Sequence, residues 1–203
     1  MARLIGVLGG TFDPPHVGHM ILAEFGRAAL SLDEVLWVLT PFPPHKPDQP
    51  ITPVEHRLAM VEAVIAEHSA FSLSRADLDR PPPHYAHGTM EALRASDSEA
   101  RWSYLMGSDS LNDLIQWDQP QRFVGLCDSL GVMRRRGAEI DLDRVEEDLP
   151  GITEKIRIFD APYVDVSGRE IRKRVRQGLT IRYLVSDPVL AIVSQRKLYQ
   201  NEV

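Results

Sequence analysis

Hydrophobic positions along the chain alternate between strand-like runs and helix-like spacing from the first residues onward. Leu4–Leu8 is a continuous apolar run, which is typical of a parallel strand buried on both faces. Glu34–Leu39 is a second such run. Between them, Val17–Leu30 has one apolar face at helical spacing. That face is formed by Val17, Ile21, Leu22, Phe25, Ala28 and Ala29. Strand, helix and strand in this order predict a parallel, right-handed unit.

The same pattern continues to the end of the chain. A helix is expected from Thr52 to His68, with Thr52 as its N-cap, Pro53 at its first position and Glu55 completing a capping box. Further strands are predicted at Phe71–Ser74, Trp102–Met106, Leu130–Met133 and Ile156–Phe159. Further helices are predicted at Thr89–Ala95, Leu111–Ile115, Gln121–Leu126, Asp141–Leu149, Ser167–Gln177 and Pro188–Tyr199.

No internal repeat or linker interrupts this order of elements. We therefore predict one α/β domain over residues 1–203, with a doubly wound parallel sheet. The last part, about residues 167–203, is expected to be a small helical extension of that domain.

Composition and charge narrow the class of protein. The 203 residues are 43% hydrophobic, as in ordinary globular proteins, and the formal net charge is -6. Nucleic acid is an unlikely main partner, because such binders depend on basic residues that neutralise phosphates. No run approaches the roughly 20 apolar residues of a membrane span, so no membrane partner is expected. The single cysteine, Cys127, excludes an intrachain disulfide and fits a reducing, cytoplasmic location. Whether the chain forms a homo-oligomer stays open.

The segment Gly9–His19 carries the strongest chemical signal. It joins the first predicted strand to the first predicted helix and reads Gly-Gly-Thr-Phe-Asp-Pro-Pro-His-Val-Gly-His. Gly9 and Gly10 let backbone approach a phosphate closely, and the helix start offers free N–H groups to an anion. His16 and His19 are three residues apart, so both side chains can project to one side. The segment predicts a polyphosphate site with two imidazole donors.

Gly10–His19 resembles the G-x-F-x-P-x-H-x-G-H signature of the nucleotidyltransferase superfamily related to class I aminoacyl-tRNA synthetases. More narrowly, the chain is similar to the bacterial nicotinate-nucleotide adenylyltransferase family, over nearly its whole length. The resemblance implies a Rossmann-like fold and transfer of AMP from ATP to nicotinate mononucleotide, giving nicotinate adenine dinucleotide and pyrophosphate. It also implies direct attack on the α-phosphorus, with Mg²⁺ carried on the ATP phosphates and no metal held by protein ligands.

The resemblance assigns roles to residues near the ATP. His16, His19 and Arg172 are the expected catalytic residues. The expected ATP-binding residues are Gly9, Gly10, Thr11, Phe12, His16, His19, Lys46, Ser167 and Arg172. Lys46 lies in a Pro-His-Lys segment after the second strand, where the other interpretation is a solvated surface lysine.

A second set of residues is expected to bind nicotinate mononucleotide. The set is Tyr85, Ala86, Asp109, Trp117 and Arg135. Ala86 stands where the family usually has threonine, so only its backbone N–H is available for the pyridine carboxylate. Asp109 is expected on ribose hydroxyls, or else as the N-cap of the next helix. Trp117 is expected to stack on the pyridine ring, or else to be a core aromatic residue.

The second signature of the superfamily is altered in this chain. Families with this loop carry [IV]-S-S-T-x-I-R, whereas Val166–Arg172 reads Val-Ser-Gly-Arg-Glu-Ile-Arg. Ser167 is still expected to cap the late helix, and Arg172 to pair with phosphate. Gly168 and Arg169 replace a serine and a threonine.

Three other functions stay open at this point. The acceptor could be nicotinamide mononucleotide or another phosphate of the same superfamily. The changed residues Gly168 and Arg169 would also fit a nucleotide-binding regulator with weakened activity. Two H-x-x-H pairs could instead bind a metal ion, and they are formed by His16, His19, His84 and His87.

Overall fold

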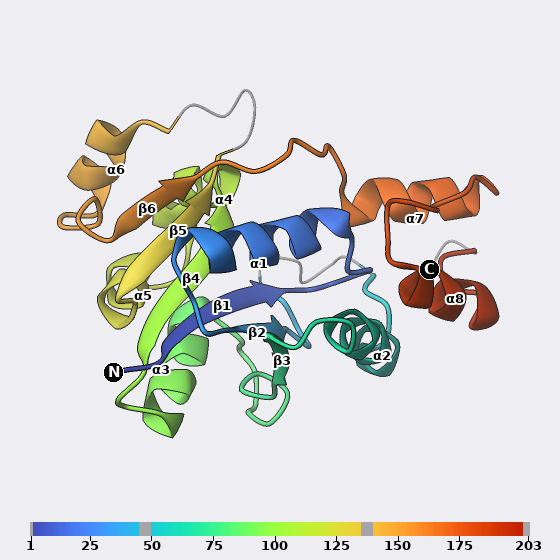
Figure 1. The fold of residues 1–203 in the computed structure, drawn as a ribbon, viewed down its shortest axis with the longest axis horizontal. Coiled ribbons are helices and arrows are strands. Elements are labelled where there is room, and N and C mark those ends of the chain that lie inside the picture. The colour runs from blue at the N-terminus through green and yellow to red at the C-terminus, as the bar shows by residue number, and fades with distance from the viewer. Residues whose placement is uncertain (1, 45–49, 135–139, 201–203) are drawn as a thin grey trace.

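The computed structural model describes residues 2–44, 50–134 and 140–200. Within these ranges six strands form one sheet in the order β3-β2-β1-β4-β5-β6 (Figure 1). The strands are β1 (Leu4–Gly10), β2 (Glu34–Leu39), β3 (Phe71–Ser74), β4 (Arg101–Gly107), β5 (Ser129–Met133) and β6 (Ile156–Phe159). All neighbouring strands are parallel, which confirms the predicted doubly wound α/β fold.

The strand order changes direction between β1 and β4. The chain first builds outward from β1 to β2 and β3, then returns to place β4 on the other side of β1. Where the loops after two neighbouring strands leave toward opposite faces of the sheet, they open a crevice at its carboxyl end. The loops that follow β1 and β4 both begin at this crevice.

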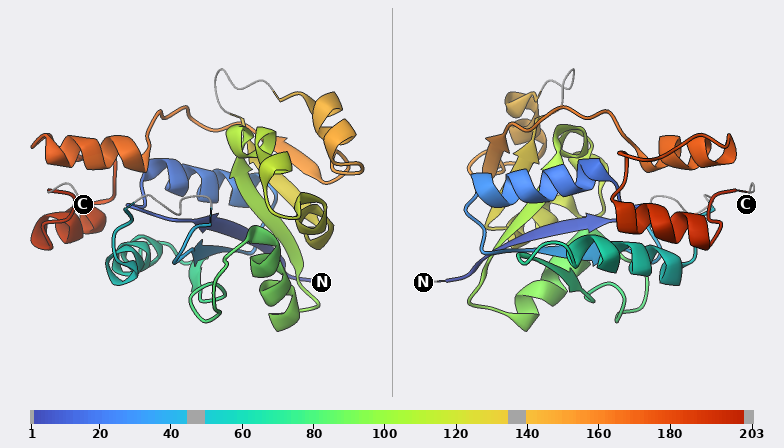
Figure 2. Two further views of the ribbon diagram at one scale, coloured as in Figure 1. Left: turned by 180° about the vertical axis from the view of Figure 1, so that it is seen from behind. Right: turned by 45° about the vertical axis from the view of Figure 1, so that its right-hand side comes forward.

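Helices connect the strands and cover both faces of the sheet. They are α1 (Val17–Ala29), α2 (Val54–Ile65), α3 (Ala86–Ser96), α4 (Ser108–Asn112), the 3₁₀ helix η1 (Leu114–Gln116), α5 (Pro120–Leu126), α6 (Leu142–Asp148), α7 (Gly168–Arg176) and α8 (Asp187–Gln195). The two opposite views show α1 on one face and α3 and α5 on the other (Figures 1 and 2). Helices α7 and α8 lie beyond the carboxyl end of β1.

Each face of the sheet has its own hydrophobic core, because alternate residues of a strand point to opposite faces. In β4, Leu105 packs on the α1 side, whereas Trp102 and Tyr104 pack on the α3 side. The C-terminal residues Ile171 and Val189 belong to the α1-side core. The late helices are therefore packed on the sheet core.

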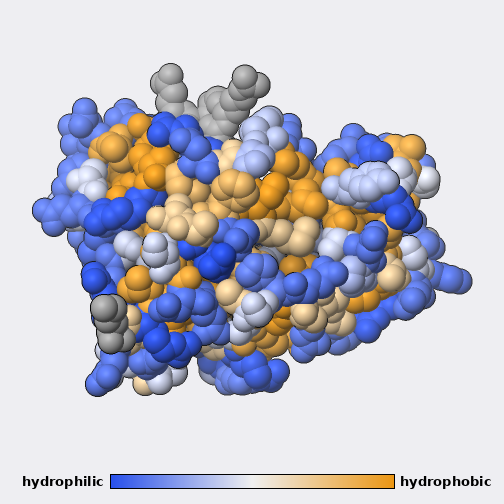
Figure 3. All heavy atoms as spheres, viewed as in Figure 1, coloured by the Kyte–Doolittle hydropathy of each residue, from blue (hydrophilic) through white to orange (hydrophobic). Residues whose placement is uncertain are grey.

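The buried face of α1 differs from the predicted one. Leu22 is buried as expected, but Ala23 and Gly26 complete the contact, and Phe25 is 38% exposed. Gly26 lies against the sheet, since a Cβ there would come within 2.9 Å of Leu105. Small residues therefore form the close contact between α1 and the sheet, and Phe25 lies outside it. Figure 3 shows hydrophobic side chains at the surface where α1 crosses this face.

Several predicted helix ends are wrong, among them the end of α2, which lies at Ile65 rather than at His68. Thr52 does not cap α2: Pro53 is the N-cap, no side chain caps it, and Thr52 instead bonds to neighbouring segments through its backbone. The helix expected at Thr89 begins at Ala86. The last helix stops at Gln195 rather than at Tyr199, because Lys197 takes a left-handed φ of 52° and ends it. No described helix is long and apolar enough to cross a membrane.

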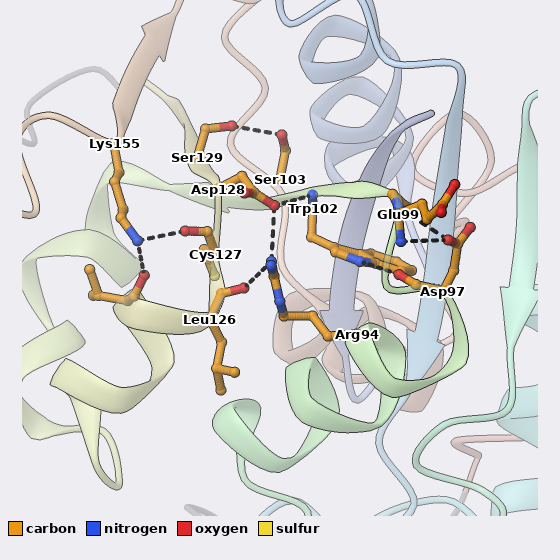
Figure 4. A network of polar contacts seen from close by, with 12 residues as sticks. Arg94, Asp97, Glu99, Trp102, Ser103, Leu126, Cys127, Asp128, Ser129 and Lys155 are labelled. Atoms are coloured by element: carbon orange, nitrogen blue, oxygen red, sulfur yellow. Dashed lines mark hydrogen bonds and ion pairs between the residues drawn. The ribbon is translucent and has the colours of Figure 1, made fainter. Parts of the chain in front are cut away.

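A polar network fixes β4 against β5 at the amino end of the sheet (Figure 4). Asp128 Oδ2 accepts hydrogen bonds from the Trp102 backbone N–H at 2.8 Å and from Arg94 at 2.9 Å. Lys155 donates to the carbonyl of Cys127 at 2.7 Å. Burial raises the pKa of the Cys127 thiol to about 12, so the thiol stays protonated and inert.

Replacing the carboxylate of this network tests its contribution to stability. Asp128→Ala leaves the Trp102 N–H without its acceptor and Arg94 with only the Leu126 carbonyl, and we expect the free energy of unfolding to fall by about 2 kcal/mol. Chemical denaturation measures this loss. The matched control is Asp79→Ala, which removes an exposed ion pair with Arg75 and is expected to cost about 0.5 kcal/mol or less. Equal losses in the two variants would contradict the assignment.

Candidate active site

The segment Gly9–His19 occupies the carboxyl end of β1, where the strand order changes. β1 ends at Gly10, His16 is the N-cap of α1, and α1 begins at Val17. The N-terminus of α7 reaches the same place from the far end of the sequence (Figure 2). The two signature segments recognised in the sequence are therefore neighbours in space.

Gly9 and Gly10 are the last residues of β1, and packing disfavours a side chain at either position. A Cβ on Gly9 would lie 2.6 Å from the Tyr104 hydroxyl oxygen, and one on Gly10 would lie 3.0 Å from the Phe12 ring. The close approach of a phosphate to their backbone stays a prediction.

The imidazoles of His16 and His19 stack on each other, which confirms that they share one side. Their ring centroids are 3.7 Å apart with an interplanar angle of 26°. The His16 backbone N–H donates to His19 Nδ1 at 3.2 Å. Because Nδ1 accepts this bond, a neutral His19 ring carries its proton on Nε2. An imidazole N–H donor is thus held at a helix N-terminus, where the dipole favours anions.

Phe12 packs between this histidine pair and the hydrophobic core. It has a left-handed φ of 47°, and its ring is 1% exposed. The ring packs on Trp37 at 5.1 Å and, edge-on, on His19 at 5.0 Å. Its side chain is therefore a core contact that orients His19. The contribution of its backbone to ATP binding stays a prediction.

A buried arginine that the sequence did not single out holds the loops together. Arg57 is 2% exposed, and its guanidinium donates to four backbone carbonyls at 2.7–2.9 Å. The acceptors are Thr11, Thr40, Pro41 and Thr52. They belong to the loops after β1 and β2 and to the approach to α2. Burial lowers the pKa of Arg57, and the nearby Asp13 carboxylate opposes that shift.

The start of α7 packs directly on the loop after β1. Ser167 caps α7 as predicted, accepting from the Glu170 N–H at 3.2 Å. Arg172 Nη1 donates to the Asp13 carbonyl at 2.5 Å. A Cβ on Gly168 would lie 2.8 Å from that same carbonyl oxygen. In this structure a side chain at residue 168 would collide with the loop backbone, so glycine allows α7 to pack closely on the loop after β1.

Two of the expected acceptor-binding residues, Tyr85 and Ala86, lie at the start of α3. Tyr85 is the N-cap, and Ala86 is the first helical residue, so its N–H is at a helix N-terminus. A second network that the sequence did not reveal fixes this end: Asp77, 2% exposed, accepts from Thr89 Oγ1 at 2.7 Å and from Arg80. Arg80 also donates to the Tyr85 carbonyl at 3.2 Å.

Trp117 lies across from the start of α3. His87, in α3, bonds Asp118 at 2.9 Å and so ties α3 to the segment after η1. Trp117 is half-buried, with its ring against Tyr104 and Phe123. It is thus partly a core residue and partly available at the surface.

Asp109 is the second residue of α4, immediately after β4, and its side chain is exposed. The N-cap of α4 is Gly107, so the alternative in which Asp109 caps this helix is wrong. Its position at the carboxyl end of β4 places it beside the end of β1. Lys46 and Arg135 lie outside the described residues.

The described residues do not support the alternative in which the two H-x-x-H pairs bind a metal ion. No group of three or more His, Cys, Asp or Glu side chains there could hold a metal ion. The pairs His16–His19 and His84–His87 therefore do not gather into one metal centre. An ion carried by substrate phosphates would need few protein ligands and fits this arrangement.

Two stacked histidines at a helix start, beside an arginine at the crevice of a doubly wound sheet, define a nucleotide-binding transferase of the α/β class. The cytidylyltransferase-like family model matches residues 7–174. A relative from Thermomicrobium roseum, named probable nicotinate-nucleotide adenylyltransferase, is 40% identical over 99% of this chain and 93% of its own length. One of the same name from Roseiflexus sp. is 39% identical over 97% and 98%. The chain belongs to the cytidylyltransferase-like family and, within it, to the nicotinate-nucleotide adenylyltransferases.

Solved structures share the fold at low sequence identity. The Plasmodium falciparum nicotinic acid mononucleotide adenylyltransferase complexed with NaAD superposes with a TM-score of 0.79 at 18% identity, covering 98% of both chains. A putative nicotinate-nucleotide adenylyltransferase from Vibrio parahaemolyticus gives 0.66 at 18% identity, covering 98% of this chain and 97% of the other. Both support the Rossmann-like architecture.

The substitution Gly18→Ala tests whether catalysis depends on the position of the His16 imidazole. A Cβ there would lie 3.1 Å from the His16 ring and from Val166, so Gly18→Ala requires the imidazole, Val166 or α1 to shift by a small fraction of an ångström. We expect kcat/KM for ATP to fall about tenfold or more, since small misplacements at a reacting centre are costly. Gly125→Ala is the control, because Gly125 lies in α5 with open space around it. Unchanged kinetics in Gly18→Ala would show that the placement of His16 is not critical.

Proposed function

We propose that this chain transfers AMP from ATP to nicotinate mononucleotide, giving nicotinate adenine dinucleotide and pyrophosphate, a step of NAD biosynthesis. The observation that carries the proposal is the stacked pair His16–His19 at the N-terminus of α1, with Arg172 packed against the same loop. The names of relatives at 34–40% identity over nearly the whole chain support it.

The reaction is a single displacement at the α-phosphorus of ATP. An oxygen of the nicotinate mononucleotide phosphate forms the new bond, the bond to the bridging oxygen breaks, and pyrophosphate leaves with that electron pair. His16, His19 and Arg172 stabilise the charge that develops on the phosphate oxygens, together with the N-terminal N–H groups of α1. Gly9, Gly10, Thr11, Phe12 and Ser167 shape the ATP site around them, and Lys46 adds a cation.

Mg²⁺ enters with ATP as part of the substrate. It neutralises phosphate charge and eases departure of pyrophosphate. The residues of this chain bind and orient the phosphates, and no protein ligand set for the ion is required.

The acceptor is held at the start of α3 and after β4. The Ala86 N–H, at the N-terminus of α3, binds the pyridine carboxylate, and Tyr85 lines the pocket. The exposed part of Trp117 stacks on the pyridine ring, and Asp109 binds ribose hydroxyls. Arg135 completes the acceptor site.

The remaining expectations form part of the same proposal. Residues 1–203 act as one nucleotidyltransferase domain, in the cytoplasm, with no nucleic-acid or membrane partner. The altered second signature does not favour an inactive regulator, because Gly168 is explained by its contact with the Asp13 carbonyl and Arg172 is retained.

Pyrophosphate release with two acceptors tests this function. The purified chain is incubated with MgATP and either nicotinate or nicotinamide mononucleotide, and pyrophosphate and dinucleotide are measured. We expect both products with nicotinate mononucleotide, at a higher kcat/KM than with the nicotinamide compound. If no dinucleotide forms with nicotinate mononucleotide and none forms with nicotinamide mononucleotide, the proposal is rejected.

His19→Ala, in the same assay, tests the catalytic assignment. Loss of the imidazole donor is expected to lower kcat by about 100- to 1,000-fold, as for other preorganised donors to transition-state charge. His68→Ala is the control, because His68 lies before β3 at the other end of the sheet and pairs with Glu24. Equal rates for His19→Ala and the control would remove His19 from the mechanism.

A further inference from the structure

Asp13 joins three distant segments to the loop that precedes α1. Its carboxylate is 5% exposed. Oδ1 accepts from the Tyr199 hydroxyl at 2.9 Å, and Oδ2 accepts from the Thr52 N–H at 3.2 Å. Its carbonyl accepts from Arg172 at 2.5 Å. One residue of the loop therefore connects the approach to α2, the start of α7 and the end of the chain.

The chain makes a specific turn to bring Tyr199 to this position. After α8, Leu198 N–H bonds back to the Val193 carbonyl at 3.0 Å, and the Leu198 side chain is buried. Tyr199 then takes a left-handed φ of 64°, which is costly for a residue with a bulky side chain. Such a conformation persists only where surrounding contacts stabilise it. The hydrogen bond from the Tyr199 hydroxyl to Asp13 is one such contact.

Arg172 and the Asp13 carboxylate form a loose ion pair. Arg172 Nη1 is 3.8 Å from Asp13 Oδ2, while its hydrogen bond goes to the Asp13 carbonyl. A carboxylate with a free oxygen would attract a guanidinium into a close, two-point pair. Here Tyr199 and Thr52 each donate to one oxygen, which satisfies part of the carboxylate's acceptor capacity and weakens its attraction for the guanidinium. Burial and the neighbouring Asp13 raise the pKa of Tyr199, so the hydroxyl keeps the proton that it donates.

We propose that Tyr199 is a positioning residue for ATP binding: its hydroxyl occupies Asp13 and thereby keeps Arg172 directed at the phosphates. The inference rests on the proposed function in that ATP binds beside this loop. Without the hydroxyl, Asp13 Oδ1 is buried without a donor, and the Arg172 guanidinium, already 3.8 Å from Oδ2, moves into a closer, two-point pair with the carboxylate. Binding of ATP then has to break that tighter ion pair first. The acceptor site at the start of α3 is not affected.

Binding of MgATP measured by calorimetry, without an acceptor, tests the proposal directly. Tyr199→Phe keeps the ring and removes the hydroxyl, and we expect the Kd for MgATP to rise about tenfold, the size of one lost bond to a charged group. In steady state, KM for ATP should rise while KM for nicotinate mononucleotide stays within about twofold. The matched control is Tyr183→Phe, because Tyr183 is 83% exposed, and its Kd should not change.

A second substitution separates positioning from general packing. Asp13→Asn removes the charge that captures Arg172 but keeps an oxygen acceptor, so the double variant Tyr199→Phe/Asp13→Asn should regain most of the lost ATP affinity. A merely structural role predicts further loss in the double variant. Should Tyr199→Phe fail to fold, Asp13→Asn alone is expected to bind MgATP within about twofold of wild type, and a tenfold loss there overturns the proposal.

The two proposals fail in different ways. If the wild type binds MgATP but makes no dinucleotide, the proposed acceptor is wrong and the role of Tyr199 is still measured. If the Kd for MgATP is the same in Tyr199→Phe and wild type, or if Asp13→Asn gives no rescue, Tyr199 does not position Arg172.

Discussion

The buried guanidinium of Arg57 is the interaction on which the carboxyl edge of the sheet depends. Its four hydrogen bonds reach carbonyls in the loops that follow β1 and β2 and in the segment before α2. Irregular loops leave such carbonyls without partners, and burying them unpaired is costly. One side chain from α2 supplies all the donors and thereby sets the path of the loop that carries His16 and His19.

Asp13 extends this arrangement from loops to helices and the chain end. Arg57 donates to backbone carbonyls of the loops near Asp13. Asp13 itself accepts hydrogen bonds from Thr52, Arg172 and Tyr199. The amino end of the sheet is built differently: Asp128 and Lys155 fix neighbouring strands to each other. The molecule thus separates a network that stabilises strand pairing from one that places phosphate-binding groups, and substitutions in the two should have different consequences.

The sequence pattern predicted local elements, whereas it did not predict contacts between distant residues. β3 and β6 match their predicted bounds, because apolar residues alternate with polar ones in Phe-Ser-Leu-Ser and Ile-Arg-Ile as expected of a strand. The signature segment likewise located His16 and His19 at the start of α1. Arg57 gave no signal, because its partners are backbone carbonyls far away in sequence. Gly168 looked like a lost hydroxyl, and only the distance to the Asp13 carbonyl explains it.

Direct transfer at the α-phosphorus fixes the stereochemical course of the reaction, which can be measured. The chain is given one diastereomer of adenosine 5′-O-(1-thiotriphosphate) with nicotinate mononucleotide, and the configuration at phosphorus in the thio-dinucleotide is determined. A single in-line displacement, positioned by His16, His19 and Arg172 without a covalent intermediate, predicts inversion. Retention of configuration would mean two displacements through an adenylylated enzyme and would contradict the account.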